Sequence, residues 1–208
     1  MTALILAGGK SRRVSSTYKA FIQLGNKSVI ERLVSGLWGQ FEEIIIVADE
    51  VERYADLGLE ILIDLMPAKG PLVGLYTGLA AIRSPYSFVV ACDMPFLSAG
   101  LIELMKKVIR PEDDVLIPRV QERLHPLHAI YSRNCLPVIK AKIGSGNFSM
   151  HSILPELKVR YLEEEEIRTI CRPEIALFNL NTDQDVEEAR RLVLEGDVPL
   201  TIRNRKGG

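Results

Sequence analysis

The sequence predicts an α/β fold, a single-domain three-layer sandwich in which helices cover both faces of a mostly parallel β-sheet. Three observations predict this fold. Short apolar runs alternate along the chain with segments of helical period. The 208 residues are 47% apolar, enough for one domain that buries roughly 70% of the surface of its extended chain. No internal repeat and no linker rich in Gly, Pro or Ser divides the chain.

The expected strands are the apolar runs Ala3–Ala7, Ile44–Val47, Leu59–Ile63, Ser87–Ala91, Val115–Pro118, Leu127–Tyr131 and Ala176–Leu180. The expected helices are Ser28–Gln40, Leu72–Ile82, Ser98–Ile109 and Asp183–Leu194. Ser98 is a suitable N-cap. The last helix begins with acidic residues and carries arginines toward its end, which suits the helix dipole. We therefore expect a domain over residues 1–196 and a loosely tied tail over 197–208.

Composition limits the class of function. With 26 basic and 27 acidic residues, the chain has no general attraction for nucleic acid or membranes, and a local positive patch would suit a small anion. Three widely spaced cysteines, Cys92, Cys135 and Cys171, form no disulfide framework and no metal-binding pattern. No apolar run approaches ~18 residues, and no basic segment precedes the first strand. We expect a soluble, cytoplasmic protein.

The first polar insert is AGGKSRR, residues 7–13, directly after the first strand. In sheets of this kind, ligands bind at the carboxyl ends of the strands. Glycines let the backbone approach a phosphate with its N–H groups, and Lys or Arg then neutralises the charge. The stretch fits neither GxxxxGK[ST] nor GxGxxG, and a plain basic turn is the alternative interpretation. Lys19 can reach back toward such a phosphate, or it is a solvated surface lysine.

A second insert, CDMP, places Asp93 at the tip of a central strand. An unpaired carboxylate is costly there, and a divalent cation would remove that cost. Mg²⁺ needs only one or two carboxylates in addition to substrate phosphate oxygens, so Asp93 alone is sufficient. Alternatively, Asp93 caps the helix after Pro95 or pairs with a lysine. We interpret Cys92 as a small apolar core residue.

Three further stretches have structural as well as functional interpretations. Gly70 and Pro71 of GPLVG either start a helix or present N–H donors to a base or phosphate. HPLHAIY, residues 125–131, is typical of a strand, and the spacing of its two histidines makes zinc improbable. The acidic run Glu163–Glu166 is most simply a solvated loop or helix end.

In this order, the motifs LAGGKSRRV with Lys19, GPLVG, CDMP, HPLHAIY and NLNTDQD resemble the molybdenum cofactor guanylyltransferases. The resemblance runs from Leu4 to about Asp185. It implies a Rossmann-like fold of the nucleotide-diphospho-sugar transferase type. It also implies transfer of GMP from GTP to molybdopterin, with release of pyrophosphate, formation of molybdopterin guanine dinucleotide and Mg²⁺ as cofactor. The partners that it implies are GTP, molybdopterin, and the proteins of molybdenum insertion and molybdoenzyme maturation, with neither nucleic acid nor membrane.

The resemblance also implies roles for individual residues. Leu6, Ala7, Gly8 and Gly9 would contact the guanine nucleotide, Arg13 and Lys19 its phosphates, and Asp49, Asp64 and Gly70 further parts of the nucleotide; Asp93 would bind Mg²⁺, and Asn179 and Asn181 would face the pterin. Arg13, Lys19 and Asp93 would be the catalytic set. Such a transfer needs positioning and charge neutralisation, and it needs no protein nucleophile.

The sequence departs from the family pattern after Arg13. Ser15 stands where the family has glycine, and Tyr18 stands where it has aspartate. The loop therefore has less backbone freedom, and a charge that could orient Lys19 is missing. Two alternatives stay open. One is a related enzyme, such as a cytidylyltransferase for the same cofactor or for a phosphorylated alcohol, or a phospholactate guanylyltransferase. The other is a catalytically weakened nucleotide-binding or cofactor-chaperoning protein.

Overall fold

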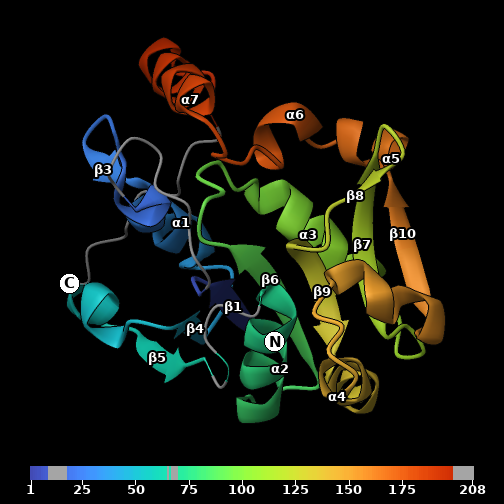
Figure 1. The fold of residues 1–208 in the computed structure, drawn as a ribbon. Helices are drawn as coiled ribbons and strands as arrows, with labels where there is room; N and C mark the ends of the chain where they lie inside the picture. The colour runs from blue at the N-terminus through green and yellow to red at the C-terminus, as the bar shows by residue number, and fades with distance from the viewer. Residues whose placement is uncertain (9–17, 65, 67–69, 199–208) are drawn as a thin grey trace.

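A computed structural model describes residues 1–8, 18–64, 66 and 70–198. Its main sheet has the strand order β10-β7-β9-β6-β1-β4-β5, with β8 paired to β7, and a separate hairpin is formed by β2 and β3 (Figure 1). The strands are β1 (Thr2–Leu6), β2 (Gln23–Leu24), β3 (Lys27–Ser28), β4 (Ile44–Ala48), β5 (Glu60–Ile63), β6 (Tyr86–Ala91), β7 (Val115–Val120), β8 (Arg123–Leu124), β9 (His128–Ser132) and β10 (Val159–Glu163). β9 runs antiparallel to β6 and β7, whereas β5, β4, β1 and β6 are parallel.

Helices cover both faces of this sheet. They are α1 (Val29–Leu37), α2 (Pro71–Ala81), α3 (Ala99–Val108), α4 (Leu136–Gly144), α5 (Glu164–Arg168), α6 (Pro173–Ala176) and α7 (Asp183–Glu195). Short 3-10 turns are η1 (Lys19–Phe21), η2 (Val51–Leu57), η3 (Arg133–Cys135) and η4 (Met150–Glu156). In β1, Ile5 shares a buried cluster with residues of α1 and α3, whereas Leu4 shares another with α2 and α4. Alternate strand residues thus face two helical layers, and the predicted three-layer α/β fold is confirmed.

Local signals explain where the helices begin. Ser28 caps α1 in a capping box with Glu31, and Thr182 caps α7 in the same way with Asp185. The hydroxyl of Ser98 accepts a hydrogen bond from the backbone N–H of Leu101 at 3.3 Å, as predicted for an N-cap. The capping segment before α7 is also the one that approaches the carboxyl ends of the strands.

Glycine sets the distance between α2 and the sheet. A Cβ atom added at Gly78 would lie 2.5 Å from Cδ1 of Leu4 in the central strand β1. Leu4 is fully buried, so it has little room to move away. Helix α2, which begins directly after Gly70, can therefore lie close to the strands that end at the candidate site.

Several sequence predictions were wrong or incomplete. Residues 176–180 form no strand, because Pro173 opens α6 and the following segment is held by a bond from the N–H of Leu180 to the carbonyl of Asp93 at 3.0 Å. Strands β2, β3, β8 and β10 and helices α4 and α6 were not predicted. β10 is a half-exposed edge strand without a long apolar run. The acidic run 163–166 caps and begins α5.

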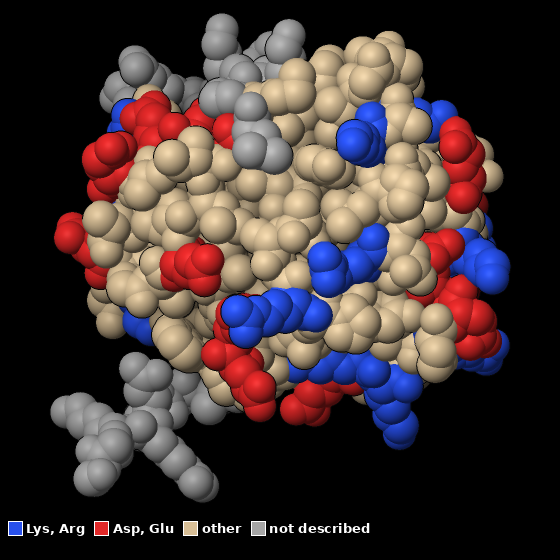
Figure 2. Space-filling view, turned by 90° about the horizontal axis from the view of Figure 1, so that it is seen from below, with Lys and Arg blue, Asp and Glu red and all other residues tan. Residues whose placement is uncertain are grey.

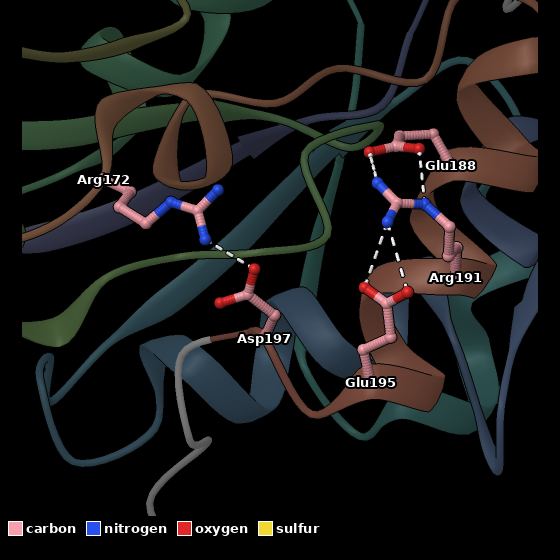
Figure 3. Close-up of polar contacts among 5 residues, drawn as sticks. All are labelled: Arg172, Glu188, Arg191, Glu195 and Asp197. Carbon is pink, nitrogen blue, oxygen red and sulfur yellow. Dashed lines mark hydrogen bonds and ion pairs between the residues drawn. The ribbon is translucent and has the colours of Figure 1, made fainter.

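The end of α7 is tied by surface ion pairs (Figure 3). Arg191 lies between Glu188 and Glu195 on the helix, and Arg172 pairs with Asp197 just after it. Such exposed pairs contribute little to stability individually. The division between residues 1–196 and a tail stays a prediction, since the description ends at Val198. Among the described helices, none combines the length and the apolar character that crossing a membrane requires.

Candidate active site

The carboxyl ends of the four parallel strands β5, β4, β1 and β6 lie side by side, as the sequence predicts. The N–H of Ala7 bonds to the carbonyl of Val47 at 2.8 Å, and the N–H of Cys92 bonds to the carbonyl of Leu6 at 3.1 Å. The N–H of Asp64 bonds to the carbonyl of Ala48 at 2.8 Å. The backbone at Leu6 and Ala7 therefore lies between the segment carrying Asp64 and the segment carrying Asp93 (Figure 1).

A buried lysine joins three distant parts of the chain. Lys19, in η1, is only 8% exposed, so it is not the solvated surface residue of the alternative interpretation. Its Nζ lies 3.4 Å from Oδ2 of Asp93 and donates a hydrogen bond to Oδ1 of Asn181 at 3.0 Å. Asp93 thus pairs with a lysine, which was the alternative to a metal site at this position. Lys19 keeps a third N–H donor for another acceptor.

The electrostatics at the tip of β6 follow from burial. Burial raises the pKa of Asp93, and the Lys19 ammonium opposes this by charge attraction and a hydrogen bond. Burial also raises the pKa of the neighbouring Cys92 to about 12, so this thiol is protonated at neutral pH. Cys92 belongs to the apolar cluster below the site, as the sequence indicated. Asp93 is therefore the charged group that this strand offers to a ligand.

Asp64 lies against the backbone of the first motif. A Cβ atom added at Gly8 would lie 3.0 Å from Oδ2 of Asp64, a tight contact that would displace this carboxylate slightly. Its Oδ1 accepts a hydrogen bond from the N–H of Met66 at 3.2 Å. Burial raises the pKa of Asp64, and the nearby charge of Asp49 adds to this rise. Asp49 has no other described part in the site.

The segment before α7 supplies the polar groups on the other side of Lys19. The backbone N–H groups of Asn181 and Thr182 both bond to Oδ2 of Asp185 at 2.7 Å, which fixes the turn that presents Asn181. Oδ1 of Asn179 is buried and has no hydrogen-bond partner among the described residues. A buried acceptor without a donor is rare in folded proteins.

The structure gives less information on the remaining predicted residues. Gly9, Arg13 and Ser15 fall outside the described residues. Gly70 is the N-cap of α2 at φ 113°, a conformation that favours glycine. Sequence reasoning missed Arg53 of η2, which contacts Tyr18 beside Lys19. An exposed arginine in a charged helical turn carries no signal that would have identified it.

The motif HPLHAIY forms a turn and the strand β9, as expected, but it contains an unusual residue. His128 is fully buried with its ring edge-on to Phe88, and neither ring nitrogen has a partner among the described residues. Burial lowers the pKa of His128 to about 3, so the ring is neutral at physiological pH.

Comparisons with known proteins identify the family to which this site belongs. Residues 3–160 match the family model described as MobA-like NTP transferase domain. The chain belongs to this family. A molybdenum cofactor guanylyltransferase of Desulfosudis oleivorans is 32% identical over 198 residues, covering 95% of this chain and 98% of that protein. A probable molybdenum cofactor guanylyltransferase of Clostridium perfringens is 35% identical, covering 91% and 96%.

Solved structures share the fold of this chain. Molybdopterin-guanine dinucleotide biosynthesis protein A from Archaeoglobus fulgidus is 25% identical, with a TM-score of 0.81 over 94% of this chain and all of that one. A nucleotidyl transferase from Methanothermobacter shares the fold at 15% identity, with a TM-score of 0.73 over 94% of this chain and 98% of that one. The family suggested by the sequence motifs is confirmed, and the chain is a nucleotidyltransferase.

Proposed function

We propose that this nucleotidyltransferase transfers GMP from GTP to molybdopterin, releasing pyrophosphate and forming molybdopterin guanine dinucleotide. The names of its relatives over nearly the whole chain support the substrates. The observation that carries the proposal is the buried Lys19, held between Asp93 and Asn181. One ammonium group thereby joins the strand tips expected to hold the nucleotide to the segment expected to face the acceptor.

The donor set at the strand tips fits Mg²⁺. The described residues contain no group of three or more His, Cys, Asp or Glu side chains that could hold a metal ion by themselves. Asp93, with a side chain 21% exposed, is the carboxylate that would hold Mg²⁺ together with phosphate oxygens of the nucleotide. Its Oδ2 faces the Lys19 ammonium, so its other oxygen would face the cation. When bound, Mg²⁺ neutralises charge that develops on the phosphates.

The chain's own residues would supply the rest of the reaction. Lys19 donates a hydrogen bond to a phosphate oxygen of the triphosphate and stabilises the pyrophosphate as it leaves. Gly8 lets the backbone approach the nucleotide, which lies beside Asp64. Asn179 and Asn181 orient the pterin so that its phosphate attacks the α-phosphorus in line. No general base is required, because the attacking phosphate is already ionised at neutral pH.

Titration calorimetry with GTP, CTP, ATP and UTP in the presence of Mg²⁺ tests the nucleotide, and a pyrophosphate-release assay with molybdopterin tests the reaction. We expect GTP-selective binding followed by release of pyrophosphate. CTP-selective binding would assign the chain to cytidylyl transfer. Binding without release would make it a nucleotide-binding protein on an enzyme's fold. Contacts with molybdenum-insertion and molybdoenzyme-maturation proteins, and a cytoplasmic location, are further proposals that rest on the same function.

A further inference from the structure

Tyr18, the residue that replaces an aspartate of the family pattern, is held by Arg53 of η2. The guanidinium carbon of Arg53 lies 3.8 Å from the centroid of the Tyr18 ring. The same guanidinium donates a hydrogen bond from Nη2 to the Tyr18 hydroxyl at 2.9 Å. Arg53 also forms an ion pair with Glu50, which fixes its orientation. Tyr18 is therefore held through both its ring face and its hydroxyl.

A second contact joins the same two segments. The rings of Phe21, at the end of η1, and Tyr54, next to Arg53, have centroids 5.3 Å apart. Tyr54 is 4% exposed and belongs to the buried cluster that includes residues of α1 and α3. The turn that carries Lys19 is thus attached to η2 on both sides, through the residue before it and through Phe21 after it.

We propose that Tyr18 and Arg53 form a clamp that positions Lys19 for binding of the triphosphate, in place of the acidic residue that the family pattern has there. This inference rests on the proposed function of Lys19. A lysine ammonium is carried by a long and flexible side chain. It reaches Asp93 and Asn181 only when the backbone at Lys19 is fixed, and the clamp fixes the neighbouring residue. Positioning before the ligand arrives lowers the ordering cost of binding.

The clamp is partly exposed to solvent, so its positioning of Lys19 can be distinguished from a purely structural role. The side chains of Arg53 and Glu50 are 35% and 48% exposed. Surface ion pairs of this kind contribute little to folding stability. Loss of the clamp should therefore leave the thermal midpoint of unfolding nearly unchanged and weaken only the interactions that depend on Lys19.

Calorimetric titration with GTP and with guanosine, both in the presence of Mg²⁺, measures how much the clamp contributes to binding of the triphosphate. For Arg53→Ala and Tyr18→Ala, we expect the affinity for GTP to fall by about 3- to 10-fold, the range of a cation–π contact. The affinity for guanosine should not change, because guanosine carries no phosphate. Tyr18→Phe keeps the ring under the guanidinium and should retain most of the affinity for GTP.

Two further variants isolate the role of Lys19. In a Lys19→Ala background, Arg53→Ala should cause no additional loss of GTP affinity, because the group that it positions is gone. Arg119→Ala is the matched control. Arg119 lies over the ring of Tyr161 at 4.8 Å and pairs with Glu163, in the strands β7 and β10 at the far edge of the sheet. Its removal should leave the affinity for GTP unchanged.

Three results would overturn the clamp alone, given a wild-type protein that binds GTP. They are an unchanged affinity for GTP in Arg53→Ala, an equal loss for GTP and guanosine, and a full additional loss of GTP affinity from Arg53→Ala in the Lys19→Ala background. A wild-type protein that binds no nucleoside triphosphate would overturn the proposed function, and the clamp with it.

Discussion

Charged side chains are buried at the carboxyl end of the central sheet and exposed at its amino end. At the carboxyl end, Lys19 and Asp64 are buried, and Asp93 is largely buried beside them. At the amino end, the turns between strands and helices form a hollow of about 620 Å³. Three exposed arginines, Arg83, Arg110 and Arg133, line this hollow. Figure 2 shows the molecule from below, with blue side chains crossing the middle of a largely uncharged face.

The difference shows which charges folding explains. At the amino end, the hydroxyl of Tyr86 lies within hydrogen-bond distance of three backbone carbonyls of the 110–113 turn and can donate to one of them at a time. The arginines there are exposed and form no ion pair with any described residue. At the carboxyl end, charged side chains are buried away from water. This burial costs free energy, and folding alone does not require it. Buried charges at strand tips therefore indicate the site better than the arginines do.

The largest expected effect is that of Asp93→Ala. Loss of the carboxylate should lower the kcat of pyrophosphate release by ~10²–10³-fold, because it removes both the proposed metal ligand and the partner of Lys19. The fold should persist, as circular dichroism would show, since Asp93 lies at a strand tip. The control is Arg133→Ala at the opposite end. Undiminished turnover in Asp93→Ala would contradict the proposed metal role of Asp93. It would also contradict the conclusion that buried charges at the strand tips indicate the site.

Lys19→Ala should have the next largest effect. We expect ~10- to 100-fold weaker binding of GTP, which is the range of one hydrogen bond to a charged group. Guanosine should bind as before, because the proposed ligand of Lys19 is a phosphate and guanosine carries none. Calorimetry with both ligands provides the test. Equal losses for the two ligands would place Lys19 away from the triphosphate.

His128→Leu tests whether every buried polar group marks function. The wild-type ring keeps a pKa of about 3 in the fold against an ordinary value of 6.5, so acid protonates the unfolded chain first. His128 should therefore cost stability as the pH falls below 6.5, by up to about 1.4 kcal/mol per pH unit. The leucine variant should lose this dependence.

At neutral pH, the same substitution should raise the free energy of unfolding by about 1–2 kcal/mol, because it removes two buried nitrogens without hydrogen bonds. Urea unfolding at several pH values measures both effects. Turnover should be unchanged, which would confine the functional charges to the strand tips. A loss of turnover at unchanged stability would instead give His128 a part in the site.

The smallest effects are expected at the amino end. Arg83→Ala, Arg110→Ala and Arg133→Ala should each change the free energy of unfolding by less than about 0.5 kcal/mol, as exposed substitutions usually do. Pyrophosphate release should remain at the wild-type level. A drop in turnover for any of them would show that the two ends of the sheet are coupled.

Local sequence patterns predicted most of the sheet and the strand-tip residues. Asp93 was found because a carboxylate directly after a buried strand is conspicuous, and Lys19 because it follows a glycine-rich basic turn. The bond between Lys19 and Asn181 could not be predicted from local patterns, since it joins residues far apart in the chain. Strand β10 was missed for a related reason. Its pairing with β7 stabilises it as a strand, although its own residues are half polar.

That bond also has a consequence for how the protein is made. Lys19 and Asn181 are 162 positions apart in the chain. At ~5–20 residues per second, a ribosome needs roughly 10–30 s to reach Asn181 after it has incorporated Lys19. Until Asn181 has been synthesised, the ammonium of Lys19 therefore lacks the amide oxygen to which it donates in the folded protein. The nascent chain can assemble the first strands early, whereas the complete set of groups around Lys19 forms only after Asn181 has been synthesised.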